Sequence, residues 1–140
     1  MYDTNSSELL VNAFDMQFLR LYCDHISSRR QLYIIDACHS AFVMRCRRPS
    51  HMKPPPSAYP VIKCISSAQS HQVAIEVGGN SIFTRSLVDA IEPEKLVTDI
   101  FCDAREKMRA TYFEQMPVLG NLVIQHRGLP CIDGDMVILD

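Results

Sequence analysis

The sequence predicts an α/β fold in which helices cover both faces of a mostly parallel sheet. Two short apolar segments, residues 32–35 and 61–68, have the character of buried strands. Segments with helical spacing of apolar residues stand before the first strand and after the second. The order is therefore helix, strand, linker, strand, helix, helix, strand, which is typical of α/β layers. The 140 residues are enough for one domain around one hydrophobic core.

The first part of the chain contains one predicted helix and one predicted strand. We expect the helix over about residues 7–25, because Asn5 and Glu8 have capping-box spacing and apolar residues then recur at helical intervals. The strand in the stretch 32–40 is expected to be buried on both faces, as in a parallel sheet. Asp36 and Cys38 stand where this strand ends.

A basic, proline-rich segment, residues 45–60, separates the two parts and is interpreted as a surface loop or linker. After the second strand, a polar loop is expected over residues 70–81, followed by a short helix. Pro93 suits the first turn of a longer helix that ends before Pro117. Phe83, Leu87 and Ile91 mark the short helix. Apolar spacing predicts the buried face of the longer helix at Val97, Ile100 or Phe101, Ala104 and Met108. Residues 121–126 and 135–140 are candidate strands in the tail.

The composition excludes several classes of protein. Apolar residues make up 47% and charged residues 21%, and the formal net charge of -2 offers no basic excess for nucleic acid. No apolar run is long enough to cross a bilayer, and the first residues do not resemble a secretory signal. The six cysteines are scattered without a C-x-x-C pair, which argues against a disulfide framework. We therefore expect a cytoplasmic or nuclear protein with no membrane or nucleic-acid partner.

Cys38 is the leading candidate for a reactive group. Reactive groups in open α/β sheets gather at the carboxyl ends of the strands, where Cys38 stands. Its own backbone N–H could supply one donor of an oxyanion hole. A small buried residue at a strand end is the alternative interpretation of the same position.

The residues around Cys38 carry a resemblance to a known family. The stretch "DACHS", residues 36–40, resembles the nucleophile motif of metacaspases and related caspase-fold peptidases, in which an acidic and a small residue precede Cys-His-Ser-Gly. Ala41 departs from that motif, since the family usually has Gly there. Residues 66–91 are similar to the stretch that opens the family's small-subunit half, and residues 114–119 resemble the Gln-x-Pro that follows its next helix. The matching positions of the first of these stretches are Ala74, Glu76, Phe83, Thr84, Leu87 and Ala90.

The resemblance implies an incomplete caspase-like three-layer sandwich over residues 1–140. Its parts would be the end of a large-subunit-like region (1–44), a linker (45–60) and a small-subunit-like region (61–140). The implied activity is that of a cysteine endopeptidase of the caspase or metacaspase type, which acts on peptides or proteins and functions in programmed cell death. Cys38 would be the nucleophile, and no cofactor is implied.

The resemblance also implies which residues bind substrate. Asp36 would line the primary specificity pocket, where a carboxylate favours Arg or Lys before the scissile bond. A carboxylate that caps its own turn is the alternative interpretation of Asp36. Ser66 and Ser67, at the end of the second strand, are implied to contact substrate as well. His39 is expected to be structural, because adjacent side chains diverge at a strand end.

A cysteine peptidase needs a base to form the thiolate, and caspases carry that histidine about 50 residues before the cysteine. Only 37 residues precede Cys38, so we expect the family's His-Gly pair to fall before Met1 and this chain alone to be inactive. His25 would lie roughly 20 Å away at the other end of the strand, whereas His71 lies on the correct edge and is the weaker alternative. His51 and His126 have no positional argument.

Without the family's preceding strands, residues 32–35 would present an open apolar edge. We therefore expect a partner, either the missing N-terminal half or a related chain. A non-catalytic caspase-like module that binds peptides or a protease is the alternative function, and the absent histidine and Ala41 favour it.

Two other segments of the chain contain candidate sites of a different kind. If the pocket takes basic side chains, the linker offers candidate self-cleavage sites, although a solvated basic loop explains them equally well: Arg45, Arg47, Arg48 and Lys53. We expect no metal. Cys23-x-His25 supplies only two ligands, and the acidic residues of the tail lack the spacing of a calcium loop: Asp133, Asp135 and Asp140.

Overall fold

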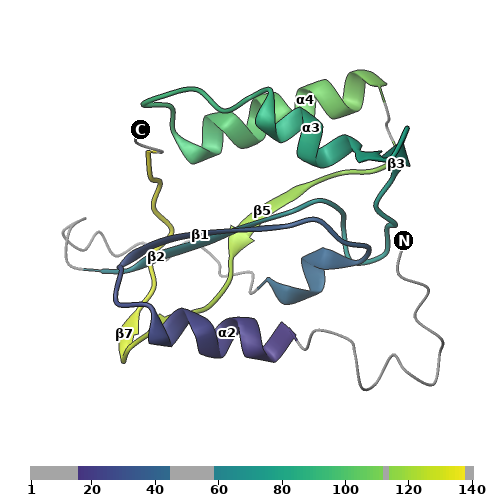
Figure 1. Cartoon of the computed structure of the whole chain (residues 1–140). Coiled ribbons are helices and arrows are strands. Elements are labelled where there is room, and N and C mark those ends of the chain that lie inside the picture. The colour runs from purple at the N-terminus through teal and green to yellow at the C-terminus, as the bar shows by residue number, and fades with distance from the viewer. Residues whose placement is uncertain (1–15, 45–58, 112–113, 138–140) are drawn as a thin grey trace, which may run out of the picture.

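The computed structural model describes residues 16–44, 59–111 and 114–137. A sheet lies between two layers of helices (Figure 1), which confirms the predicted α/β class with helices on both faces. One layer consists of α3 (Ile82–Val88) and α4 (Val97–Thr111), and the other of α2 (Met16–His25) with the short 3₁₀ helix η1 (Ser40–Val43). No helix in these ranges has both the length and the apolar composition that a membrane-spanning segment requires.

The sheet has three strands in the order β1 (Arg30–Ile35), β2 (Val61–Ser66) and β5 (Val118–Asn121). β1 and β2 are parallel over six residues each, with Ile35 opposite Ser66. β5 runs antiparallel to β2, with Val118 opposite Ser66. The sheet is therefore mixed, and in the described part of the chain β1 and β5 are its edge strands.

The central strand β2 connects the two halves of the core, because all six of its residues are buried. Its side chains alternate between the two faces, as strand geometry requires. Ile65 packs in a cluster with α3 and α4, while Ile62 and Cys64 pack in a second cluster with Cys23 of α2. The predicted buried face of the longer helix is confirmed at every position: Val97, Ile100, Phe101, Ala104 and Met108.

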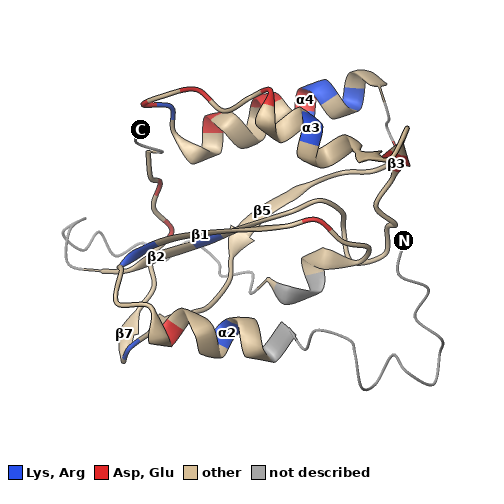
Figure 2. Ribbon diagram, in the orientation of Figure 1, with Lys and Arg blue, Asp and Glu red and all other residues tan. Residues whose placement is uncertain are grey.

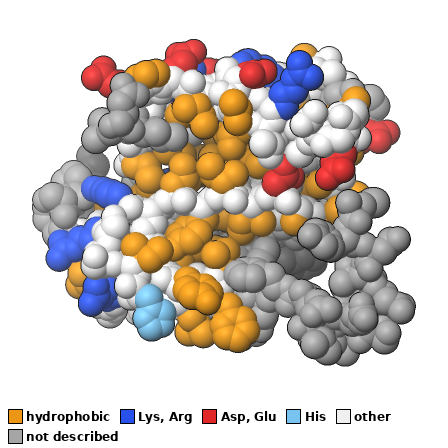
Figure 3. Space-filling view, in the orientation of Figure 1, with side chains coloured by type: hydrophobic (Ala, Val, Ile, Leu, Met, Phe, Trp, Pro, Cys, Tyr) orange, Lys and Arg blue, Asp and Glu red, His pale blue; other side chains and the backbone are white. Residues whose placement is uncertain are grey.

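The prediction that the first strand is buried on both faces is wrong. β1 is only partly buried, and the side chain of Ile34 is 48% exposed. The physical reason is that β1 has β2 on one side and no described strand on the other. Apolar side chains gather on both sides of this edge in the space-filling view (Figure 3). The open apolar edge that the sequence predicts is therefore present among the described residues.

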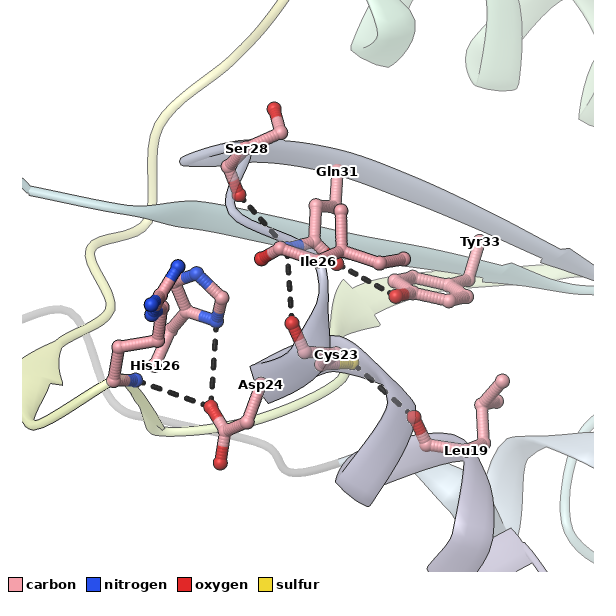
Figure 4. A network of polar contacts seen from close by, with 9 residues as sticks. Leu19, Cys23, Asp24, Ile26, Ser28, Gln31, Tyr33 and His126 are labelled. Carbon is pink, nitrogen blue, oxygen red and sulfur yellow. Dashed lines mark hydrogen bonds and ion pairs between the residues drawn. The ribbon is translucent and has the colours of Figure 1, made fainter.

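A polar network fixes the beginning of β1 against α2 (Figure 4). The buried side-chain amide of Gln31 donates to the carbonyl oxygens of Cys23 at 3.2 Å and Ser28 at 2.8 Å, and its oxygen accepts from the Tyr33 hydroxyl at 2.6 Å. Because Gln31 sits at the start of β1, this network marks the rim of the sheet opposite to Cys38.

The longer helix begins later than predicted, because Pro93 lies in a turn before it. Glu94, the residue after Pro93, has a left-handed backbone conformation with φ 61, which is incompatible with a position inside an α-helix. The helix begins at Val97, whose N–H donates to the Met136 carbonyl at 2.9 Å. The Asp135 carboxylate then accepts from the Thr98 N–H at 3.3 Å. Donors at this helix start are thus satisfied by the tail of the chain.

The loop predicted over residues 70–81 contains a small hairpin of β3 (Glu76–Val77) and β4 (Asn80–Ser81). Its turn is formed by Gly78 and Gly79, whose φ values of +62 and +79 favour glycine.

The strand predicted over residues 121–126 is wrong in its bounds. β5 begins before residue 121, at Val118, and a second hairpin pairs β6 (Gln125–His126) with β7 (Leu129–Pro130). Of the second predicted strand, 135–140, the structure describes residues 135–137, where Val137 forms an isolated bridge with Leu96. The physical reason is the antiparallel pairing of β5 with β2, which uses residues 118–121 and leaves the next residues to turn into the hairpin.

Several predicted segments lie wholly or partly outside the described residues. These are the first part of the N-terminal helix (7–15), most of the linker (45–58) with the candidate cleavage sites and His51, and residues 138–140.

Candidate active site

Cys38 lies at the carboxyl rim of the sheet, in the turn that connects β1 to η1. Its side chain is exposed, and its sulfur accepts a hydrogen bond from the Ala74 N–H at 3.4 Å. Ala74 belongs to the loop after β2, so the sulfur stands beside the segment that follows the neighbouring strand. A side chain in this position is accessible to a peptide carbonyl, and the Ala74 donor is available to negative charge on the sulfur.

His39, the residue after the nucleophile candidate, adopts a left-handed conformation with φ 56 and ψ 20. Left-handed backbone is uncommon for residues other than glycine, and here two bonds hold it in place. The His39 N–H donates to the Gln72 carbonyl at 2.9 Å, and Nδ1 lies 2.9 Å from the Ser70 carbonyl. A carbonyl oxygen only accepts, so the proton must be on Nδ1. The imidazole of His39 thus anchors the turn to the following loop.

Ala41 fits its position without backbone strain. It lies in η1 and is absent from the described residues with positive φ, so a glycine is not required there. Its N–H donates to the Ala68 carbonyl at 3.2 Å. The departure from the family's usual Gly therefore leaves the local geometry intact.

Ser66 and Ser67 are fully buried beneath the Cys38 turn. The Ser67 hydroxyl accepts from the Ala37 N–H at 3.1 Å and donates to the Ala37 carbonyl at 3.2 Å. The Ser66 hydroxyl is hydrogen-bonded to the Ser40 hydroxyl at 2.7 Å and donates to the Ala68 carbonyl at 2.7 Å. In this structure the two hydroxyls hold the turn that carries Cys38. The contact with substrate that the sequence predicts for them stays a prediction.

Two glutamines that sequence reasoning missed fix the loop opposite Cys38. Gln115 is fully buried; its side-chain oxygen accepts from the Ile75 N–H at 2.7 Å, and its amide donates to the Ser67 carbonyl at 2.9 Å. Gln72 accepts from the Met116 N–H at 3.0 Å and donates to the Glu114 carbonyl at 2.9 Å. The Gln-x-Pro motif was a signal for Gln115, whereas nothing in the sequence distinguished Gln72 from an ordinary loop residue.

Asp36 precedes Cys38 by two residues and is exposed at the same rim. One of its carboxylate oxygens, Oδ2, accepts a hydrogen bond from the Thr84 hydroxyl at 2.6 Å. Figure 2 shows an acidic segment of the ribbon beyond the end of β1, and the bond to Thr84 joins this end of the strand to α3. The structure thus brings Asp36, Cys38, Ser66 and Ser67 together at one rim.

No histidine among the described residues is hydrogen-bonded to the Cys38 sulfur. The ring of His39 is bonded to Ser70, and His71 is exposed in the loop. His25 ends α2, at the beginning of β1. His126 is buried and has its Nδ1 3.4 Å from an Asp24 oxygen, on the network side of the molecule (Figure 4).

The other cysteines of the described residues differ from Cys38 because they are buried or half-buried. Burial raises the pKa of Cys64 to about 12. Burial also raises the pKa of the Cys23 thiol above its ordinary value. These two cysteines therefore remain neutral thiols near pH 7 and are part of the core.

The described residues contain no group of three or more His, Cys, Asp or Glu side chains placed to hold a metal ion. The Cys23 thiol donates to the Leu19 carbonyl at 3.4 Å. Asp133 pairs with Lys63 at 2.7 Å, and Asp135 accepts from the Thr98 N–H.

Comparison with known proteins identifies the family. The chain has no match among the curated proteins and none among the solved structures. The family model described as the caspase domain matches residues 1–125, which include both strand ends of the rim and all the residues that hold the Cys38 turn. The chain therefore belongs to the caspase domain family of cysteine peptidases.

Proposed function

We propose that this protein is a cysteine endopeptidase that cleaves after Arg or Lys, with Cys38 as its nucleophile. The observation that carries the proposal is the pairing of an exposed sulfur with an exposed carboxylate two residues earlier, at the carboxyl rim of the sheet. Membership of the caspase domain family supports the cysteine-peptidase chemistry, and the carboxylate supports the basic preference.

The reaction would begin with attack of the Cys38 thiolate on the carbonyl carbon of the scissile bond. A carbon–sulfur bond forms, and the carbonyl electrons move onto oxygen, where the Cys38 backbone N–H is one available donor. The carbon–nitrogen bond then breaks, and the amine leaves with the proton that the base took from the Cys38 thiol. Water hydrolyses the resulting thioester and restores the thiol.

Asp36 would supply the preference for basic side chains. Its carboxylate is exposed, and its described partner is the neutral hydroxyl of Thr84, so the negative charge has no cation opposite it in the described residues. A guanidinium or ammonium group of a substrate would supply that cation through charge-assisted hydrogen bonds.

We propose that the base comes from outside the described residues. A strand supplied by a further segment or by a related chain would pair with the open edge of β1 and cover the exposed side chain of Ile34. In parallel with β1, such a strand would end at the rim of Cys38, where a histidine at its carboxyl end could reach the sulfur.

A second candidate function is a non-catalytic module that binds basic peptides. The observation that favours it is the absence of any imidazole bonded to the Cys38 sulfur among the described residues. Such a module would retain Asp36 as its recognition group and lose only the chemical step.

The test compares this chain with a chain extended upstream. Both are incubated with a peptide substrate that has Arg before the scissile bond, and with an Arg-directed thiol-reactive inhibitor. We expect cleavage by the extended chain alone, and much faster labelling of its Cys38, with Cys38→Ser as the control. Equal labelling of both chains would place the base within these 140 residues. Arg-peptide binding without cleavage by the extended chain would favour the non-catalytic module.

Self-cleavage in the linker is the proposed means of processing. The candidate sites are Arg45, Arg47, Arg48 and Lys53. Sequencing of new N-termini after incubation of the active protein should find cuts there, and cuts only elsewhere would contradict this part of the proposal.

A further inference from the structure

We propose that Thr84 determines specificity by orienting the Asp36 carboxylate for a basic side chain. The inference rests on the proposed function and concerns the residue on which the preference for Arg or Lys depends. Its starting point is the 2.6 Å hydrogen bond from the Thr84 hydroxyl to Oδ2 of Asp36, which connects positions 48 residues apart.

The segment 74–84 contacts the Asp36–Cys38 turn at both of its functional side chains. At its beginning, the Ala74 N–H donates to the Cys38 sulfur. At its end, the Thr84 hydroxyl donates to Asp36. The Ile82 N–H donates to the Ile75 carbonyl at 3.2 Å and closes the loop between these two contacts. One segment of the chain therefore contacts both the nucleophile and the carboxylate.

The hydroxyl of Thr84 is available for this role because another residue caps the helix. Thr84 lies in the first turn of α3, and its backbone N–H is satisfied by the side chain of Ser81 at 3.2 Å. The hydroxyl is thus not needed for the cap, and both Thr84 and Asp36 are exposed. A structural role in the core is excluded by this exposure, since the two side chains are accessible to a ligand.

The hydrogen bond has two consequences for recognition. An exposed Asp side chain rotates freely, and a bond at one oxygen holds the carboxylate in one orientation, so that binding a cation costs less ordering. The Thr84 oxygen also keeps acceptor lone pairs after it has donated its proton. The Asp36 carboxylate and the Thr84 oxygen together form an acceptor group for the several N–H donors of an Arg or Lys side chain.

The experiment measures charge-dependent recognition without requiring turnover. A peptidyl chloromethyl ketone with Arg next to the ketone alkylates Cys38 by displacing chloride, which forms a thioether. The same peptide with citrulline, the neutral isostere of Arg, is the reference probe. The ratio of the two alkylation rates at Cys38, measured by mass spectrometry, reports the recognition of positive charge at the site.

Three variants and a control define the expected results. Thr84→Val keeps the shape and the Ser81 cap but removes the hydroxyl, and it should lower the ratio about tenfold. Thr84→Ser should remain within about twofold of the unchanged protein because it keeps the hydroxyl. Asp36→Asn should lower the ratio most. Combining Thr84→Val with Asp36→Asn should lower the ratio no further. Thr111→Val, which removes a hydroxyl that donates within α4, is the matched control.

The outcomes separate the inference from the function on which it rests. A ratio that falls in Asp36→Asn but not in Thr84→Val would overturn the role of Thr84 and leave the basic preference intact. A ratio near one in the unchanged protein, or no change in Asp36→Asn, would overturn the basic preference and the role of Thr84 with it. An equal loss in Thr84→Ser and Thr84→Val would show that packing, and not the hydroxyl, is responsible, and would also overturn the inference.

Discussion

The parallel strands β1 and β2 end side by side at the same rim, but the residues that follow them are in opposite environments. After β1 come Asp36 and Cys38, both exposed. After β2 come Ser67 and Ala68, both fully buried. Each end is a run of small and polar residues, so composition alone does not explain the difference. The explanation is position in the sheet: the edge strand leads its chain outward, whereas the central strand continues beneath the turn of its neighbour.

The two strand ends therefore have different roles at this rim. The exposed end carries the proposed nucleophile and the proposed recognition carboxylate, and the buried end supplies hydrogen bonds to the turn that contains them. Ser67 is bonded to both backbone groups of Ala37, midway between Asp36 and Cys38. Gln115 then connects Ser67 to the loop that contacts the Cys38 sulfur. Reactive groups held by buried neighbours are the arrangement that precise chemistry needs.

The largest expected effect is a difference in thiol reactivity between Cys38, which follows β1, and Cys64, which lies in β2. In the folded protein, iodoacetamide should alkylate Cys38 at least about 100-fold faster than Cys64, because a buried thiol reacts only after local opening. Mass spectrometry of peptides from a quenched time course measures both rates. In denaturant the two rates should converge. Similar rates in the folded protein would show that the β2 strand is not enclosed as described.

The second prediction concerns Gln115. The Gln115→Leu variant should lose about 2 kcal/mol of unfolding free energy, because it leaves the Ile75 N–H and the Ser67 carbonyl without their partner. Urea denaturation measures the change. Gln125→Leu, an exposed position in β6, is the control and should change stability by less than about 0.5 kcal/mol. Equal effects of the two variants would mean that the buried amide does not support the rim.

The third prediction uses the pH dependence of stability. The pKa of Cys64 is raised by burial from 9.0 to about 12 in the folded state. Between these values the unfolded chain loses a proton that the folded chain keeps, so stability falls as pH rises above 9.0. The loss due to Cys64 should be about 1.4 kcal/mol at pH 10. Cys64→Val cannot ionise, and its unfolding free energy should decline less steeply over this range in urea titrations. Identical slopes would contradict the buried state of the thiol.

The smallest expected effect is that of the Ser67 hydroxyl. Ser67→Ala should reduce the free energy of unfolding by about 1 kcal/mol, since the Ala37 N–H and carbonyl lose their buried partner. It should also lower the ratio of the Arg-probe to the citrulline-probe alkylation rate at Cys38, because Ala37 joins Asp36 to Cys38. Ser70→Ala, in the adjacent loop, is the control. A loss of stability with an unchanged ratio would show that the Ser67 hydroxyl supports the fold but not the site.

The sequence predicts the parts of the fold that depend on local pattern. The apolar spacing of residues 97–108 identifies the buried face of α4 at every position, because helical period is a local property. The exposure of Ile34 and the start of α4 at Val97 depend on neighbours far away in the chain. An edge strand looks like a central one until its partners are known, and the Met136 carbonyl that meets the Val97 N–H lies 39 residues later.

The same distinction applies to the site. Cys38 and Asp36 follow from a short motif at a strand end, and the structure brings them to one rim. The bonds from Gln72, Gln115 and Thr84 connect separate loops and helices, and no spacing in the sequence expresses them. The burial of Ser66 and Ser67 likewise depends on which strand lies in the middle of the sheet.

The course of the C-terminal tail has a consequence for how the molecule unfolds. Cys131 is packed in the cluster beneath the sheet, whereas Met136 packs against the cluster above it and its carbonyl accepts from the first residue of α4. In Figure 1 this stretch runs past the sheet from the β7 hairpin toward α4. The six residues 131–136 thus join one half of the core to the other, in addition to β2, so the halves should melt in a single transition. A chain ending at Gly134 should lose this second connection and melt at a lower temperature, which differential scanning calorimetry measures.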